Sequence, residues 1–350
     1  MISQKRIYKY DFLRTIAIAM VVGVHCLAFT DNGWAHDDQY YVVMSSLLFT
    51  ANSLFFIMSG KFNLKEKPGY PLHKLYFKKV RNILLPALLY MFIDIAFTLY
   101  IIPGTEGGSV LHLFKTYVIG AVDTLSGTVY WFVMLLFGFL LASPFLAHIF
   151  SHLSEAETKA FAILGMLWCA FSYVCKNLGL EFGWSYVFTN FFFAFCMGAI
   201  LTEERVATFS KSTIRLVIAS LVSWFFAALL PLAGWTAGAY DTSPLYYLLS
   251  FFVYLLLLSI GEKAKPNDLV SLIAKHSYGI YLVHLLLMSI FLTYLPRVYG
   301  APSILMHIAG TVLTLFSALL VAIVIDKTLV KWLQAIADVI FNKVTKETVK

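Results

Sequence analysis

Apolar stretches and short polar breaks alternate along the whole chain. Each apolar stretch is long enough to cross about 30 Å of hydrocarbon as a helix. The stretches lie at residues 12–30, 41–62, 82–102, 129–150, 160–178, 184–201, 214–232, 243–261, 277–296 and 303–326. This pattern predicts an all-α fold, a polytopic transmembrane helical bundle of about ten spans that occupies residues 1–326.

Lysine and arginine are divided unevenly between the two sides that alternate spans define. Of the 26 Lys and Arg residues, 22 lie on the side that holds the N-terminus. Only Lys115, Lys176 and Arg297 lie on the other side, and Arg14 is inside the first span. This asymmetry predicts that both termini are cytoplasmic. Residues 327–350 carry one apolar stripe among lysines, which predicts a cytoplasmic amphipathic tail.

The composition agrees with a membrane protein, because 60% of the residues are hydrophobic and only 13% are charged. The net charge of +7 resides in short loops, where it sets topology, so we expect no nucleic-acid partner. The four cysteines lack metal-type spacing, and we expect free thiols and no metal. The N-terminal apolar run lacks a small-residue cleavage site, which favours an uncleaved first span.

The first span carries a basic group and an imidazole on one face. Eleven steps of about 100° bring Arg14 and His25 to nearly the same side of a helix, roughly 16 Å apart along its axis. Ionisable groups inside a span are costly to bury and therefore mark candidate functional residues. His25 is either a general base or a hydrogen-bonding partner of another helix. Asp11 either lines the same site or anchors Arg14 at the interface.

Other spans carry further polar candidates. Asn52 and Ser59 share a face of the second span, Asp94 lies in the middle of the third, and Trp131 begins the fourth. Each either lines a site or has a structural role. The structural role would be helix packing for Asn52 and Ser59, a hydrogen bond for Asp94, and an interfacial aromatic anchor for Trp131.

Ser277, Tyr281 and His284 form one stripe on the ninth span, where they either line a cavity or bond to neighbouring helices. The loop before the third span is the most basic segment of the chain. Its Lys78 and Arg81, three residues apart, are candidates for binding the phosphates of a cytosolic cofactor. Topology and attraction to anionic membrane lipids explain the same charges.

Four of these stretches, in this order, resemble motifs of the bacterial membrane acyltransferase family called acyltransferase type 3. The motifs are Tyr10-Asp11-x-Leu13-Arg14 with His25, Phe55-Phe56-x-x-Ser59-Gly60, Lys78-x-x-Arg81 with Pro86, and Ser277 to His284. That family includes O-acyltransferases of lipopolysaccharide, capsule and peptidoglycan. The resemblance implies an acyl-CoA donor on the cytoplasmic side, an essential histidine at position 25 and a contributing arginine at position 14. The chain resembles the stand-alone, membrane-only members.

One position departs from the family pattern. The basic motif of the family has arginine at both ends, whereas this chain has Lys78 at the first, and lysine cannot make a bidentate phosphate contact. The phosphate-binding role is therefore more secure for Arg81.

The resemblance implies a membrane-bound O-acyltransferase, with acetyl-CoA or another acyl-CoA as donor and a cell-envelope glycan or other hydroxylated molecule as acceptor. Lys78 and Arg81 would hold the CoA phosphates, and Arg14 would lie against the pantetheine or thioester. His25 would act as general base or carry the acyl group. We expect a multi-pass protein of the bacterial plasma (inner) membrane, in contact with membrane lipids, and leave its oligomeric state open.

A multispan transporter or exporter of a polar solute or glycan is the alternative function. The intramembrane Asp94 and His284 favour it. The lack of an evident internal repeat speaks against a repeat-built transporter.

Overall fold

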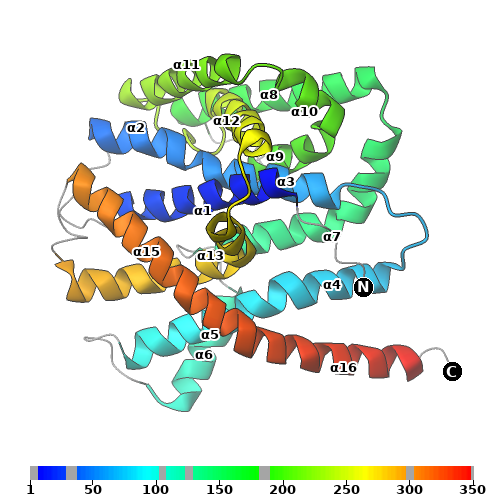
Figure 1. The fold of residues 1–350 in the computed structure, drawn as a ribbon, viewed down its shortest axis with the longest axis vertical. Coiled ribbons are helices and arrows are strands. Elements are labelled where there is room, and N and C mark those ends of the chain that lie inside the picture. Colours follow the sequence, from blue (N-terminus) through cyan, green and yellow to red (C-terminus); the bar gives the residue numbers. More distant parts are fainter. Residues whose placement is uncertain are drawn as a thin grey trace. The chain divides into compact units, whose positions relative to one another are not determined.

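Helices make up the regular structure of the protein (Figure 1). The computed structural model describes residues 7–28, 38–101, 108–122, 129–180, 190–296 and 303–347. Every regular element in these ranges is helical, which confirms the predicted all-α class. The chain divides into two compact units. The first holds Met1–Glu66, Ala142–Lys275 and Gly300–His307, and the second holds Lys67–Leu141, His276–Tyr299 and Ile308–Lys350.

Nine helical segments within the described ranges are long and apolar enough to cross a membrane. They are Tyr8–Ala28, Gln39–Asn63, Leu72–Tyr100, Tyr130–His152, Glu155–Asn177, Thr213–Leu232, Pro244–Lys263, Asp268–Tyr294 and Ile304–Thr345. The remaining predicted span, 184–201, begins outside the described residues. Arg297 also lies outside them. Its described part is the apolar helix α9 (Asn190–Ile200). The cytoplasmic placement of both termini stays a prediction.

The first unit is built around α1 (Tyr8–Ala28), α3 (Thr50–Asn63), α9 and α12 (Pro244–Lys263), which pack against one another. Glycines allow this close packing. A Cβ at Gly60 or Gly198 would overlap the backbone of the facing helix, so only glycine lets α3 and α9 approach this closely. Gly261 of α12 lies in the same way against the backbone of Lys9.

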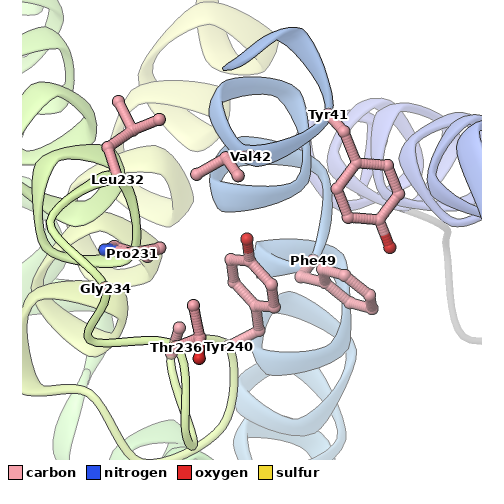
Figure 2. Close-up of a pocket in the computed structure, with 9 residues that line it drawn as sticks. Tyr41, Val42, Phe49, Pro231, Leu232, Gly234, Thr236 and Tyr240 are labelled. Carbon is pink, nitrogen blue, oxygen red and sulfur yellow. The ribbon is translucent and has the colours of Figure 1, made fainter. Parts of the chain in front are cut away.

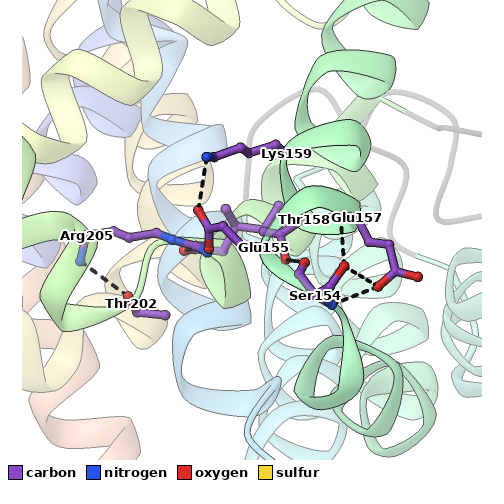
Figure 3. Close-up of polar contacts among 8 residues, drawn as sticks. Ser154, Glu155, Glu157, Thr158, Lys159, Thr202 and Arg205 are labelled. Atoms are coloured by element: carbon purple, nitrogen blue, oxygen red, sulfur yellow. Dashed lines mark hydrogen bonds and ion pairs between the residues drawn. The ribbon is translucent and has the colours of Figure 1, made fainter.

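The other helices of the first unit are α2 (Gln39–Leu48), α8 (Glu155–Asn177), α10 (Glu203–Phe209) and α11 (Thr213–Leu232). Ser154 begins α8 with a reciprocal capping box, in which its hydroxyl accepts from the Glu157 backbone N–H and the Glu157 carboxylate accepts from the Ser154 backbone N–H. Figure 3 shows this cap beside Glu155, which pairs with both Lys159 and Arg205. The pair of Glu155 with Arg205 connects the start of α8 to α10.

The second unit contains α4 (Leu72–Lys79), the π-helical turn η1 (Val80–Leu84), α5 (Leu85–Tyr100) and α6 (Val110–Val122). It also holds most of α7 (Tyr130–His152), α13 (Asp268–Tyr294) and α15 (Ile304–Ile325). A second π-helical turn, η3 (Asp326–Val330), joins α15 to α16 (Lys331–Glu347). Pro86, the second residue of α5, lacks the N–H that an α-helical bond to Asn82 would need, so it favours the wider turn.

The C-terminal tail is helix α16, which contacts α4 through aromatic side chains. The rings of Phe77 and Phe341 stack with centroids 3.9 Å apart and an interplanar angle of 11°. Phe341 lies on a different side of α16 from the apolar stripe, whose members Trp332, Ile336, Val339 and Ile340 are exposed. The stripe is therefore open to contact with lipid, as the predicted amphipathic tail requires.

Candidate functional site

Helix α1 presents Arg14 and His25 from one unbroken element, so the spacing of roughly 16 Å along one face follows from helix geometry. The Arg14 guanidinium lies 3.7 Å from a carboxylate oxygen of the buried Asp11. His25 is half-buried, and its Nδ1 donates to the Val21 carbonyl at 2.8 Å. Because a carbonyl only accepts, Nδ1 carries a proton, and in the neutral form of the ring the lone pair is on Nε2. In that form Nε2 is the nitrogen that can act as a base.

The entrance of α1 is held by a charged network around Glu203, the first residue of α10. Tyr10 donates to one Glu203 oxygen at 2.6 Å, and the ammonium of Lys9 lies 3.2 Å from the other. The buried ammonium of Lys61 lies 3.3 Å from Glu203 and donates to the Leu201 carbonyl. Burial raises the pKa of Glu203, but the bonds from Tyr10 and Lys9 and the charge of Lys61 outweigh it and lower that pKa to about 2.

A buried histidine, His307 at the start of α15, supports the other end of α1. Its Nε2 donates to the Gly23 carbonyl at 2.8 Å, and its Nδ1 accepts from the Tyr40 hydroxyl at 2.9 Å. Gly23 is two residues from His25, so this bond fixes the backbone that carries the candidate base. The sequence signal was an isolated histidine in an apolar span.

Asn52 and Ser59 are half-buried on α3, which packs against α1 in the same unit. The neighbouring Ser53 is fully buried and donates to the Tyr246 hydroxyl at 3.0 Å. The first unit therefore brings the predicted residues Asp11, Arg14, His25, Asn52 and Ser59 onto two adjacent helices.

Arg81, in η1 of the second unit, already binds an anion. Its Nε and Nη2 donate to the two oxygens of Asp338 in α16, at 2.6 and 2.8 Å. Its Nη1 donates to Asn82 at 2.8 Å, and Gln334 of α16 donates to its carbonyl at 3.2 Å. Lys78 is exposed one turn earlier. The Arg81 fork thus presents the two-donor geometry that suits a carboxylate or a phosphate.

A second carboxylate, Asp326, joins three helices of this unit at the turn η3. It accepts from the Tyr90 hydroxyl at 2.9 Å and from Nδ1 of the buried His276 at 2.7 Å. Gly279 packs beside Tyr90 and Asp326, where a side chain would collide with the Tyr90 hydroxyl. Sequence reasoning missed His276 and Asp326, although His276 directly precedes the stripe on the ninth span.

That stripe makes hydrogen bonds within the second unit. Tyr281 donates to the Val129 carbonyl, and Nδ1 of the fully buried His284 donates to the Tyr281 carbonyl at 2.6 Å. Ser277 is buried as well. The Tyr281 bond leads to the residue before α7, and the His284 bond stays within α13. A role of the stripe in lining a cavity stays a prediction.

Two further predicted residues also lie in the second unit. Trp131 is half-buried, with its ring edge-on to Phe132 at 5.9 Å. Asp94 is half-buried in α5. Among the described residues, no donor makes a hydrogen bond to its carboxylate.

A cavity of about 540 Å³ opens in the first unit between α2, the end of α11 and the loop that follows (Figure 2). Tyr41, Phe49 and Tyr240 supply an aromatic wall, and Thr236 adds a hydroxyl. The Phe49 and Tyr240 rings stack with centroids 4.8 Å apart. Burial raises the pKa of Tyr240 to about 12, so it stays a neutral hydrogen-bond donor. The volume and the mostly apolar lining are those of a small-ligand pocket.

Length, hydropathy and helical structure define a multi-pass membrane protein, with an oriented imidazole in one unit and an anion-binding arginine in the other. A family model described as an acyltransferase domain (acyltransferase 3) matches residues 7–327. The chain therefore belongs to the acyltransferase 3 family and is a membrane acyltransferase. No curated protein and no solved structure matches it.

Proposed function

We propose that the protein transfers an acyl group, acetyl in the simplest case, from cytosolic acyl-CoA to a hydroxyl of a cell-envelope glycan in the bacterial plasma membrane. The observation that carries this proposal is the His25 ring, whose bond to the Val21 carbonyl leaves Nε2 as the basic atom. Family membership supplies the acyl-transfer chemistry. The donor, the acyl group and the acceptor are the parts that we propose.

In this reaction Nε2 of His25 takes the proton of the acceptor hydroxyl as its oxygen attacks the thioester carbonyl. The C–S bond then breaks, the acyl group stays on the acceptor oxygen, and the CoA sulfur leaves and receives the proton from His25. Attack by Nε2 itself, through an acyl-imidazole, gives the same products in two steps. Arg14, roughly 16 Å along the same face, would lie against the pantetheine arm of the donor.

The donor phosphates would bind at Arg81 and Lys78. Arg81 supports this role because it holds a two-oxygen anion through two donors, although that anion is now Asp338. A phosphate bound in the same fork replaces the carboxylate, so the donor must compete with α16. The exposed Lys78 would add a point charge one turn away.

The aromatic cavity of Figure 2 is our candidate for the acceptor. Its lining residues belong to the start of the second predicted span, the end of the seventh and the loop after the seventh. The charge count predicts that these segments lie on the outer side of the membrane. Stacked rings suit the apolar faces of a sugar, and the hydroxyls of Tyr41, Thr236 and Tyr240 suit its polar edges.

The proposal is tested by incubating purified protein with isotope-labelled acetyl-CoA and an envelope glycan fraction. We expect free CoA to be released in step with label entering the glycan. General-base assistance is worth about 10²–10⁴-fold in rate, so His25→Ala should lose about that factor. His112→Ala, at an exposed histidine of α6, is the matched control and should keep full activity. Full activity in His25→Ala, or solute flux without thioester consumption, would overturn the assignment.

A further inference from the structure

A cluster of two histidines and a glutamate lies outside the proposed acyl-transfer site. His148 and His152 follow one another at i, i+4 in the last turn of α7, and Glu66 comes from the segment after α3. All three are exposed, and all three belong to the first unit. Cysteine spacing alone predicts no metal centre, but histidines spaced i, i+4 on a helix place both rings on one side.

The ligand atoms of the cluster are already close together. One ligand atom from each of the three side chains lies within 4.8 Å of the other two. His148 Nδ1 donates to a Glu66 oxygen at 2.8 Å, and the two imidazole centroids are 4.4 Å apart. In a tetrahedral zinc site, bonds of about 2.0–2.2 Å put neighbouring ligand atoms roughly 3.3 Å apart. Side-chain movements of about 1–2 Å would therefore bring the three ligand atoms to the spacing of a zinc site.

Surrounding hydrogen bonds hold the ligands in place. Ser151 donates to the second Glu66 oxygen at 2.9 Å, and His152 Nδ1 donates to the His148 carbonyl at 2.8 Å. Metal-binding histidines commonly donate their other ring nitrogen to a carbonyl or carboxylate in this manner. The exposed fraction of the His148 side chain is 67%, so a hydrated ion can reach the cluster from solvent.

We propose that Glu66, His148 and His152 bind a divalent transition-metal ion of the zinc type. Two imidazoles and one carboxylate favour Zn²⁺ over Mg²⁺ or Ca²⁺, which prefer all-oxygen sites. Three protein ligands leave a position for water. The bound ion replaces the proton shared by His148 and Glu66 and fastens the segment after α3 to the last turn of α7, because the ligands come from these two places.

Zinc binding to the full-length protein in detergent tests this proposal without reference to acyl transfer. The protein is purified with a histidine-free tag and titrated with Zn²⁺ against a chromophoric chelator. We expect one equivalent to bind with Mg²⁺ in excess. Glu66→Gln should bind about 10–100-fold more weakly, the range known for disturbed metal shells, and the His148→Gln/His152→Gln double variant at least 100-fold more weakly. His112→Gln, an exposed histidine elsewhere, should bind as the wild type does.

Amide hydrogen exchange gives a second measurement on the same samples. Zn²⁺ should slow exchange in the segment around Glu66 in the wild type and leave it unchanged in the double histidine variant. Two results overturn the proposal: a wild type that binds no stoichiometric Zn²⁺, and a double variant that binds as tightly as the wild type.

Discussion

The contact between Arg81 and Asp338 yields a quantitative prediction for donor binding. If the CoA phosphates bind the Arg81 fork, the Asp338 carboxylate must leave it first, and the free energy of that ion pair is subtracted from donor affinity. Asp338→Asn keeps the size of the side chain and removes its charge, so it weakens the competitor without emptying the space. The variant should therefore bind donor more tightly than the wild type.

The magnitude follows from the exposure of the pair. The two hydrogen bonds are short, but the Arg81 and Asp338 side chains are 28% and 40% exposed, so solvent screens the attraction. Partly exposed ion pairs of this kind contribute about 0.5–1 kcal/mol. That free energy corresponds to a change in apparent affinity of roughly 2- to 5-fold.

The assay is steady-state CoA release at fixed acceptor, with acyl-CoA varied at low and at moderate salt. KM for acyl-CoA should fall roughly 2- to 5-fold in Asp338→Asn, with kcat unchanged, and the gap should narrow as salt screens the pair. Asp268→Asn, an exposed aspartate at the start of α13, is the matched control and should leave KM unchanged. A raised KM in Asp338→Asn would refute the reasoning, because it would mean that Asp338 positions Arg81 for the donor.

Three further predictions concern the donor fork, helix packing and the charged network. Arg81→Lys should raise KM for acyl-CoA in the same assay, because an ammonium cannot reproduce a two-donor contact; an unchanged KM would remove Arg81 from the donor site. Gly198→Ala should cost about 1–3 kcal/mol by overpacking α3 against α9, seen as a lower unfolding temperature, whereas Gly138→Ala, which meets open space, should not. The pKa of Glu203 is depressed to about 2, so its stabilising effect is complete above its ordinary pKa of 4.5 and is lost as pH falls towards 2. Thermal unfolding between pH 6 and 3 should therefore vary less in Glu203→Gln than in the wild type, and Glu204→Gln should behave as the wild type.

Local periodicity predicted much of the fold and one face of the site. Each apolar stretch specifies its own helix, and the spacing from Arg14 to His25 needs only the geometry of that helix. The partners of these residues could not be predicted in the same way. Glu203 is 193 residues from Tyr10, and Asp338 is 257 residues from Arg81. Periodicity tells which side of a helix is polar, but it carries no information about which distant helix faces that side.

The long-range partners nevertheless share a feature that the sequence does display. Glu203 follows the end of α9, Asp326 follows the end of α15, and Asp338 lies one helix further on. Glu203 and Asp326 are thus carboxylates placed just beyond an apolar stretch, in a chain with only 19 acidic residues against 26 basic ones. Because a buried or half-buried cation or phenol at a span end requires a partner, and carboxylates are scarce, the few acidic residues that follow spans are the natural candidates. Pairing a polar side chain at a span end, such as that of Tyr10, with those carboxylates reduces its possible distant partners to a short set of alternatives.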